Sequence, residues 1–144
     1  MTGFYDNSIF NFDYQPPYLI ITVKKFNNNE EEFKMTELVL KKFFKMKHNG
    51  QPIKFAYMFI IKTLNICDIS LMKRIGNILD KYKEQAEQQV FASSIIINRN
   101  LSGVVNILKK LMNVFKNEIP TTFVHNIKDA KIFINKYKPK ELKT

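Results

Sequence analysis

The sequence is poor in cysteine, in glycine and in long apolar runs, and each shortage excludes a class of protein. Its single cysteine, Cys67, cannot form a disulfide within the chain, which favours a reducing compartment. No apolar run reaches the roughly 18 residues that a membrane-spanning helix needs, so we expect no transmembrane segment. The four glycines form neither GxGxxG nor GxxxxGK[ST], so the phosphate-binding loops of dinucleotide-binding proteins and P-loop enzymes are missing.

Candidate catalytic and metal-binding residues are equally sparse. His48, His125 and Cys67 are far apart in the sequence, and no CxxC, HExxH or EF-hand spacing occurs. No GxSxG elbow marks a hydrolase nucleophile. Most acidic residues fall on predicted helix ends and faces, where they stabilise helices. We therefore predict no catalytic residue, no metal site and no cofactor, in a protein that is not an enzyme.

The composition fits one globular domain. The chain has 144 residues, of which 45% are hydrophobic and 25% charged, and a chain of this size can bury one proper core. The first 23 residues hold two aspartates and no basic residue, unlike a secretory leader or a transit peptide. We expect a protein of the cytoplasm or of an organelle interior, not a secreted one.

The positive charge comes from lysine. The net charge is +10, and residues 34–47 and 128–144 are its most basic segments. One interpretation is a nucleic-acid or ribonucleoprotein surface in which the C-terminal tail acts together with four phosphate-binding lysines. These lysines are Lys41, Lys42, Lys45 and Lys47. The other interpretation is solvated helix faces in an A/T-rich gene, because phosphate recognition favours the bidentate arginine fork and arginine is rare here.

Hydrophobic periodicity predicts strands that alternate with helices. The predicted strands cover residues 9–14, 18–26, 54–62, 91–98 and 121–125. The predicted helices run from residue 30 to the His48-Asn49-Gly50 stop, and over residues 71–86, 104–115 and 126–137. Asn126 and Asp129 have the spacing of a capping box at the start of the last helix. This order predicts an α/β fold in which crossover helices join a mostly parallel, mixed sheet of four to five strands.

We divide the chain into three parts. Residues 1–16 form an N-terminal arm that can add an edge strand, residues 17–137 form the α/β domain, and residues 138–144 form a lysine-rich tail.

The turn between the central strand and the second helix, residues 63–72, is the predicted docking site. In open α/β sheets, ligands and partners bind at the carboxyl ends of the strands. Asp68 can cap the helix, and Ser70 then lies in its first turn, where a phosphate would meet backbone N–H groups. Lys73 and Arg74 would supply polar contacts at the rim. An ordinary helix cap with a solvated serine is the alternative explanation of Asp68 and Ser70.

The run from residue 18 to residue 137 resembles the STAS domain, the SpoIIAA-like fold of anti-sigma-factor antagonists. The resemblance rests on Leu19–Val23 and Phe55–Ile61 as strands, on the Asp68-Ile69-Ser70-Leu71 turn, on Ile95-Ile96-Ile97, and on the ending Phe123–Ala130. Two residues depart from the family pattern, because Ile69 replaces a small hydroxyl residue and Leu71 replaces glycine. The resemblance implies a protein-binding module without enzymatic activity, with Ser70 at the position phosphorylated in bacterial antagonists. Some members bind nucleotides or lipids.

The sequence therefore predicts a STAS-like subunit of a larger assembly. Its expected partner is a protein, bound through Asp68, Ser70, Lys73 and Arg74. Binding of nucleic acid is the alternative function.

Overall fold

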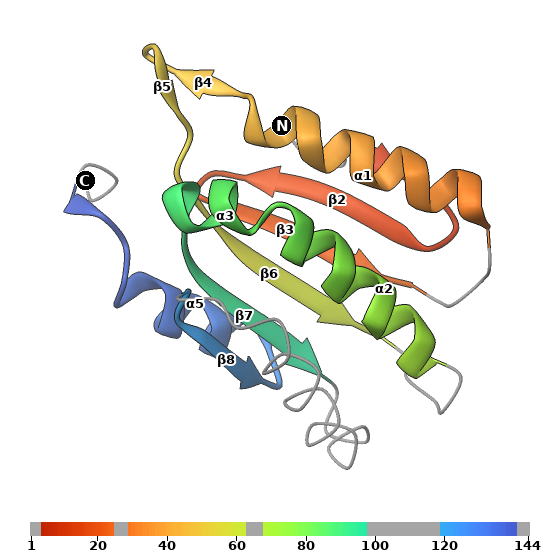
Figure 1. Cartoon of the computed structure of the whole chain (residues 1–144). Helices are drawn as coiled ribbons and strands as arrows, with labels where there is room; N and C mark the ends of the chain where they lie inside the picture. Colours follow the sequence, from red (N-terminus) through yellow and green to blue (C-terminus); the bar gives the residue numbers. More distant parts are fainter. Residues whose placement is uncertain (1–3, 25–28, 63–67, 98–118, 141–144) are drawn as a thin grey trace.

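The computed structural model describes residues 4–24, 29–62, 68–97 and 119–140, and it shows an α/β fold built on a mixed six-stranded sheet (Figure 1). The strands of this sheet lie in the order β1-β2-β3-β6-β7-β8. Their bounds are β1 Tyr5–Asp6, β2 Phe10–Gln15, β3 Tyr18–Val23, β6 Phe55–Ile61, β7 Val90–Ile97 and β8 Thr121–Val124. The helices are α1 Glu30–Phe44, α2 Asp68–Lys81, α3 Lys83–Gln89 and α5 Ile127–Asn135. A separate hairpin consists of β4 Lys47–His48 and β5 Gln51–Pro52.

The sheet is antiparallel at its N-terminal side and parallel elsewhere. Strands β1, β2 and β3 pair antiparallel, whereas β3, β6, β7 and β8 pair parallel. The predicted α/β class with a mixed sheet is thus confirmed. The sheet has six strands where the sequence predicts four or five, because β1 is only two residues long and shows no periodicity. Strand β2 is the expected partner of β3, and β1 occupies the edge beside it.

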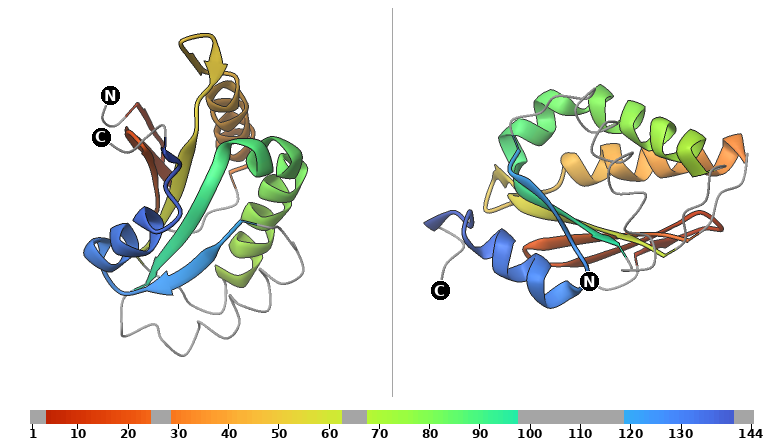
Figure 2. Two further views of the ribbon diagram at one scale, coloured as in Figure 1. Left: turned by 90° about the vertical axis from the view of Figure 1, so that its left-hand side faces the viewer. Right: turned by 90° about the horizontal axis from the view of Figure 1, so that it is seen from below.

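Helices cover both faces of the sheet (Figure 2). Helices α1, α2 and α3 pack on one face, over the larger of the two cores, and α5 packs on the other. Side chains alternate between the two faces along a strand, so β6 sends Phe55, Tyr57 and Phe59 into the larger core and Ala56 and Met58 into the smaller one. This double burial explains why β6 has an almost continuous apolar sequence.

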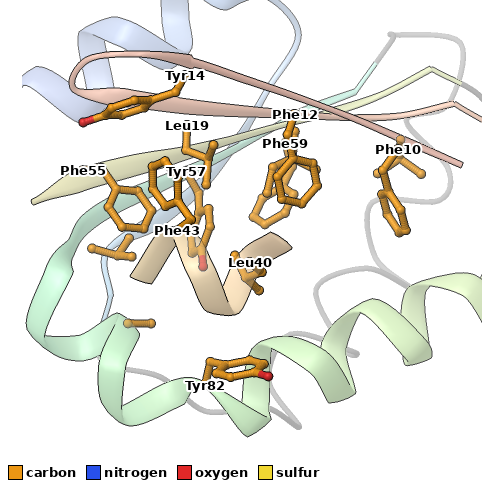
Figure 3. Packing of buried hydrophobic residues seen from close by; sticks show 14 of the residues in the cluster. Phe10, Phe12, Tyr14, Leu19, Leu40, Phe43, Phe55, Tyr57, Phe59 and Tyr82 are labelled. Atoms are coloured by element: carbon orange, nitrogen blue, oxygen red, sulfur yellow. The ribbon is translucent and has the colours of Figure 1, made fainter. Parts of the chain in front are cut away.

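The larger core is rich in aromatic rings, as Figure 3 shows. Phe43 of α1 lies edge-on to Phe55, with ring centroids 4.8 Å apart, and edge-on to Tyr14 at 4.9 Å. Edge-to-face pairs of this kind stabilise a core beyond the area that they bury. They fix the C-terminal end of α1 over the start of β6.

Polar caps explain where α1 and α5 begin. The side chain of Asn29 accepts a hydrogen bond from the Glu32 amide (3.2 Å). At α5, the Asn126 Oδ1 accepts from the Asp129 amide at 2.8 Å, and the Asn126 amide group donates to the Asp129 carboxylate at 3.2 Å. The predicted capping pair of Asn126 and Asp129 is therefore confirmed.

The first helix ends earlier than the sequence predicts. Helix α1 ends at Phe44, and residues 47–52 form the β4–β5 hairpin instead of a further turn of helix. Asn49 and Gly50 both have positive φ, 53° and 77°, which is the combination that a tight hairpin turn with an Asn-Gly sequence requires. The expectation of a helix up to His48 is therefore wrong.

The second predicted helix, residues 71–86, is two helices. Tyr82 separates α2 from α3 with φ −105° and ψ 22°. Its ring is buried and stacks on Phe44 of α1, with centroids 6.0 Å apart. The helix is interrupted where this ring packs against α1. The periodicity of apolar residues over 71–86 does not indicate the interruption. The helix predicted over residues 104–115 lies outside the described residues, as do Cys67 and the end of the lysine-rich tail.

Candidate functional site

The predicted docking turn leads into the start of α2, at the carboxyl end of β6. Residues 63–67 lie outside the described residues, and for residues 68–72 the structure describes the backbone alone. Asp68 is the first residue of α2, and Ser70 lies in its first turn. Lys73 and Arg74 follow Ser70 by three and four residues, so they lie one turn further along the same side of the helix.

Arg74 is held by α1. Its guanidinium donates two hydrogen bonds to the Glu30 carboxylate, one of them 2.8 Å long, and lies 3.9 Å from the centre of the Phe33 ring. The hydrogen bonds to Arg74 lower the pKa of Glu30, and those to Glu30 raise the pKa of Arg74. Bidentate and stacked arginine geometry of this kind is demanding and specific. Arg74 therefore links α1 and α2, and its guanidinium is already engaged by Glu30.

A second ion pair joins the same two helices further along. Lys81 of α2 donates to the Glu37 carboxylate at 3.1 Å, and this hydrogen bond raises the pKa of Lys81. Lys73, by contrast, is exposed and forms no ion pair with any described residue. Of the predicted rim residues, Lys73 is thus available to a partner.

A hollow of about 250 Å³ lies between α1 and α2. Its lining consists of Glu30, Phe33, Lys34, Glu37, Arg74, Asn77 and Ile78. Phe33 and Ile78 give it an apolar part, and the two ion pairs lie along its length. We call this hollow the α1–α2 groove.

Helix α1 also has two exposed apolar side chains outside the lining of the α1–α2 groove. Met35 is 50% exposed and Leu38 is 48% exposed. Leu38 follows Lys34 of the groove by one helical turn, and Met35 adjoins Leu38 at a spacing of three residues. The sequence pattern alone predicts no role for these residues or for the acidic members of the groove. Met35 and Leu38 are nonetheless visible in the sequence, because they interrupt the polar side of α1 between Lys34 and Lys41.

The four lysines of the alternative site lie at the other end of the sheet. Lys41, Lys42 and Lys45 lie at the C-terminal end of α1, and Lys47 lies in the β4–β5 hairpin. All four are exposed. None of them forms an ion pair within the described part of the chain.

The described acidic and histidine side chains form no metal-binding cluster. Among residues 4–24, 29–62, 68–97 and 119–140, no group of three His, Cys, Asp or Glu side chains could hold a metal ion. His125 donates from Nδ1 to the Ile97 carbonyl at 2.9 Å, at the carboxyl end of β7, whereas His48 lies in the hairpin at the opposite end of the sheet. None of the described helices has both the length and the hydrophobicity needed to cross a bilayer.

No protein-family model matches the chain, and no curated protein or solved structure matches it either. The resemblance to the STAS family therefore stays a prediction.

Proposed function

We propose that the protein is a non-enzymatic interaction module that docks a partner protein on the α1–α2 groove. The observation that carries the proposal is the groove itself, a hollow lined mostly by polar residues with an apolar part, on a helix that also exposes two apolar side chains. Exposed apolar residues next to a hollow are a common feature of protein-binding surfaces. The STAS-like pattern of the sequence supports the same function, as a regulatory or structural subunit of a larger assembly.

The groove favours a partner with an apolar side chain flanked by a carboxylate. Ile78, which is only partly buried, would contact the apolar side chain, whereas Phe33 is buried beneath Arg74. Lys34 and Lys73 form no ion pair with described residues and could receive the carboxylate. The Arg74–Glu30 pair would hold the two walls of the groove at a fixed spacing, because a bidentate pair restrains both helices.

The test is affinity purification from the native source, with the tagged wild-type protein compared with a Met35→Glu/Leu38→Glu double variant. Two carboxylates on exposed positions leave the fold unchanged but add charge beside the groove. We expect the variant to lose a specific partner, with recovery reduced about tenfold or more, a loss that corresponds to at least about 1.4 kcal/mol of binding free energy. Its melting temperature should match that of the wild type.

The matched control is Ile127→Glu/Ile132→Glu on α5. Both isoleucines are exposed and lie on the opposite face of the molecule, so the control adds the same charge away from the groove. It should recover the partner as the wild type does. Equal recovery by all three proteins, or equal loss in both variants, would contradict docking at the groove.

Phosphorylation of Ser70 is part of the proposal. A phosphate in the first turn of α2 would be stabilised by the helix N-terminus and would lie one turn from Lys73. Mass spectrometry of the native protein identifies the modification directly. Ser70→Asp should alter partner recovery relative to Ser70→Ala, and identical recovery by the two variants would show that charge at this position has no role.

A further inference from the structure

The fold brings two lysine-rich segments, about 90 residues apart in the sequence, to the same end of the sheet. Residues 41–54 and 131–140 hold nine lysines and no aspartate or glutamate. Figures 1 and 2 show the β4–β5 hairpin and the C-terminal end of α5 at the amino ends of the parallel strands. We call this surface the lysine-rich end. Its members are Lys41, Lys42, Lys45, Lys47, Lys54, Lys131, Lys136, Lys138 and Lys140.

Contacts around the start of β6 fix both segments there. On one face of the sheet, the Ile53 amide donates to the Met46 carbonyl at 3.2 Å, which ties the hairpin segment to the end of α1. On the other face, the Tyr18 hydroxyl donates to the Asn135 side chain of α5 at 3.0 Å. Tyr18 pairs in register with Ala56 of β6. The two basic segments therefore border the same short stretch of β6 from opposite faces.

Helix stabilisation accounts for only some of these lysines. Cations in the last turn of a helix interact favourably with the negative end of its dipole, and the effect fades beyond that turn. Lys41, Lys42 and Lys45 at the end of α1 fit this explanation. Lys47 in the hairpin and Lys138 and Lys140 beyond α5 do not.

We propose that the lysine-rich end binds the phosphate backbone of a nucleic acid. Two neighbouring lysine-rich segments that contain no acidic residue attract a polyanion whose phosphates are closely spaced, and binding then releases counterions. An anionic membrane is less suited to the hairpin segment of this end, and membrane binding is one outcome of the test. Interfacial binding needs apolar insertion as well as charge, and residues 41–54 expose no large apolar side chain, whereas residues 131–140 expose Ile132 and Tyr137. The groove occupies the opposite end of α1, so this inference is independent of the docking function.

The test measures binding of the full chain to a short labelled single strand and to the matching duplex, by fluorescence anisotropy at salt concentrations between about 50 and 200 mM. Two double variants remove one segment each, Lys45→Gln/Lys47→Gln and Lys136→Gln/Lys140→Gln. Each should weaken binding and reduce the slope of log affinity against log salt by about 1 for every lysine lost, hence by about 2. The control Lys62→Gln/Lys128→Gln removes the same charge at the carboxyl ends of the strands and should bind as the wild type does.

Three results would overturn the inference. The first is an unchanged salt slope in either double variant, since both segments must contact phosphates. The second is equal weakening in the control, which would show a response to net charge alone. The third is binding to phosphatidylserine vesicles without binding to either oligonucleotide, which would identify a membrane surface instead. Melting temperatures of all variants ensure that folded proteins are compared.

Discussion

At the scale of single residues, Tyr57 combines a well-packed ring with a buried polar group that forms no hydrogen bond to a described residue. Its hydroxyl is buried and has no hydrogen-bond partner among the described residues. Its ring packs against Phe59 and Phe55, with centroids 5.1 and 5.4 Å away. The ring therefore contributes apolar contacts, while the hydroxyl loses its bonds to water without replacement, a cost of about 1–3 kcal/mol. Burial also raises the pKa of Tyr57 above its ordinary value of 10.0.

We expect Tyr57→Phe to raise the free energy of unfolding by about 1 kcal/mol, because it removes the unsatisfied hydroxyl and keeps the ring. Urea denaturation at neutral pH measures this change. The free energy of unfolding of the variant should also change less than that of the wild type as the pH rises above about 10. The neutral phenol is favoured in the folded state, so wild-type stability is complete below about pH 10 and falls above it, as the unfolded chain ionises.

Tyr18→Phe is the control for this prediction. It removes a hydroxyl that donates to Asn135 at 3.0 Å, so it should lower stability slightly, by less than about 1 kcal/mol. A loss of stability in Tyr57→Phe as large as that in Tyr18→Phe would mean that the Tyr57 hydroxyl has a partner after all.

At the scale of elements, the contact between α1 and α2 depends on charge as well as on apolar packing. Arg74–Glu30 and Lys81–Glu37 are the ion pairs that cross between these helices within the described residues. Exposed ion pairs contribute little stability individually, so their main effect here is on the spacing of the two helices.

Glu30→Gln should make this contact less sensitive to acid. The pKa of Glu30 lies below its ordinary value of 4.5 because Arg74 binds the carboxylate. The stabilisation is present above about pH 4.5 and is lost as the pH falls through the lowered pKa. We therefore expect the wild type to melt above the variant at neutral pH and the difference to vanish in acid. Calorimetry or circular dichroism across this pH range measures it.

The control for the acid response is Glu84→Gln, which removes an exposed carboxylate of α3 that forms no ion pair with described residues. Because Glu84 lies in the first turn of α3, its loss should lower the melting temperature only slightly, and by less than Glu30→Gln does at neutral pH. A difference for Glu30→Gln that persists unchanged in acid would show that lost packing, not the ion pair, is responsible.

The sequence predicts those elements whose signals are local. Strands β6 and β7 are long apolar runs, and Asn126 with Asp129 forms a cap within four residues, so each is recognisable without knowledge of the fold. The Asn49-Gly50 turn is also local, but the same residues that close a hairpin can end a helix, so the sequence does not distinguish the two structures. The break at Tyr82 coincides with packing of its ring against Phe44, 38 residues away, and no local pattern contains that contact.

The candidate site was harder to predict because its contacts are distant in sequence. Arg74 and Glu30 are 44 residues apart, so the sequence could nominate Arg74 as a surface residue but could not indicate that α1 already binds it. The groove arises for the same reason, since it exists only when the two helices lie side by side. The two lysine-rich segments likewise come together only in the folded chain, although each is recognisable in the sequence by itself.

At the scale of the whole molecule, α5 closes the second face of the sheet. Ala130 and Ile134 are completely buried against Ala56, Met58, Ala92 and Ile96. The buried Ser94 hydroxyl of β7 donates to the Ala130 carbonyl at 3.4 Å. Within the described part of the chain, the smaller core therefore depends on one short helix, α5.

We expect Ile134→Ala to lower the free energy of unfolding by about 2–4 kcal/mol, because it leaves a cavity beneath α5. Ile132→Ala, on the same helix but 53% exposed, should change it by less than about 0.5 kcal/mol. Chemical denaturation of both variants measures the contrast. Similar losses in the two would show that helix propensity, rather than closure of the second face, determines the effect.

Helix α1 also reaches both proposed binding surfaces. Its first turns line the groove and its last turns carry lysines of the opposite end, and its 15 residues span about 22 Å. A helix of four turns packed on a sheet is stiff, so it fixes the distance between the two proposed surfaces. A protein bound at one end and a nucleic acid bound at the other would be held at a fixed separation. The molecule would then work as a rigid spacer between the two.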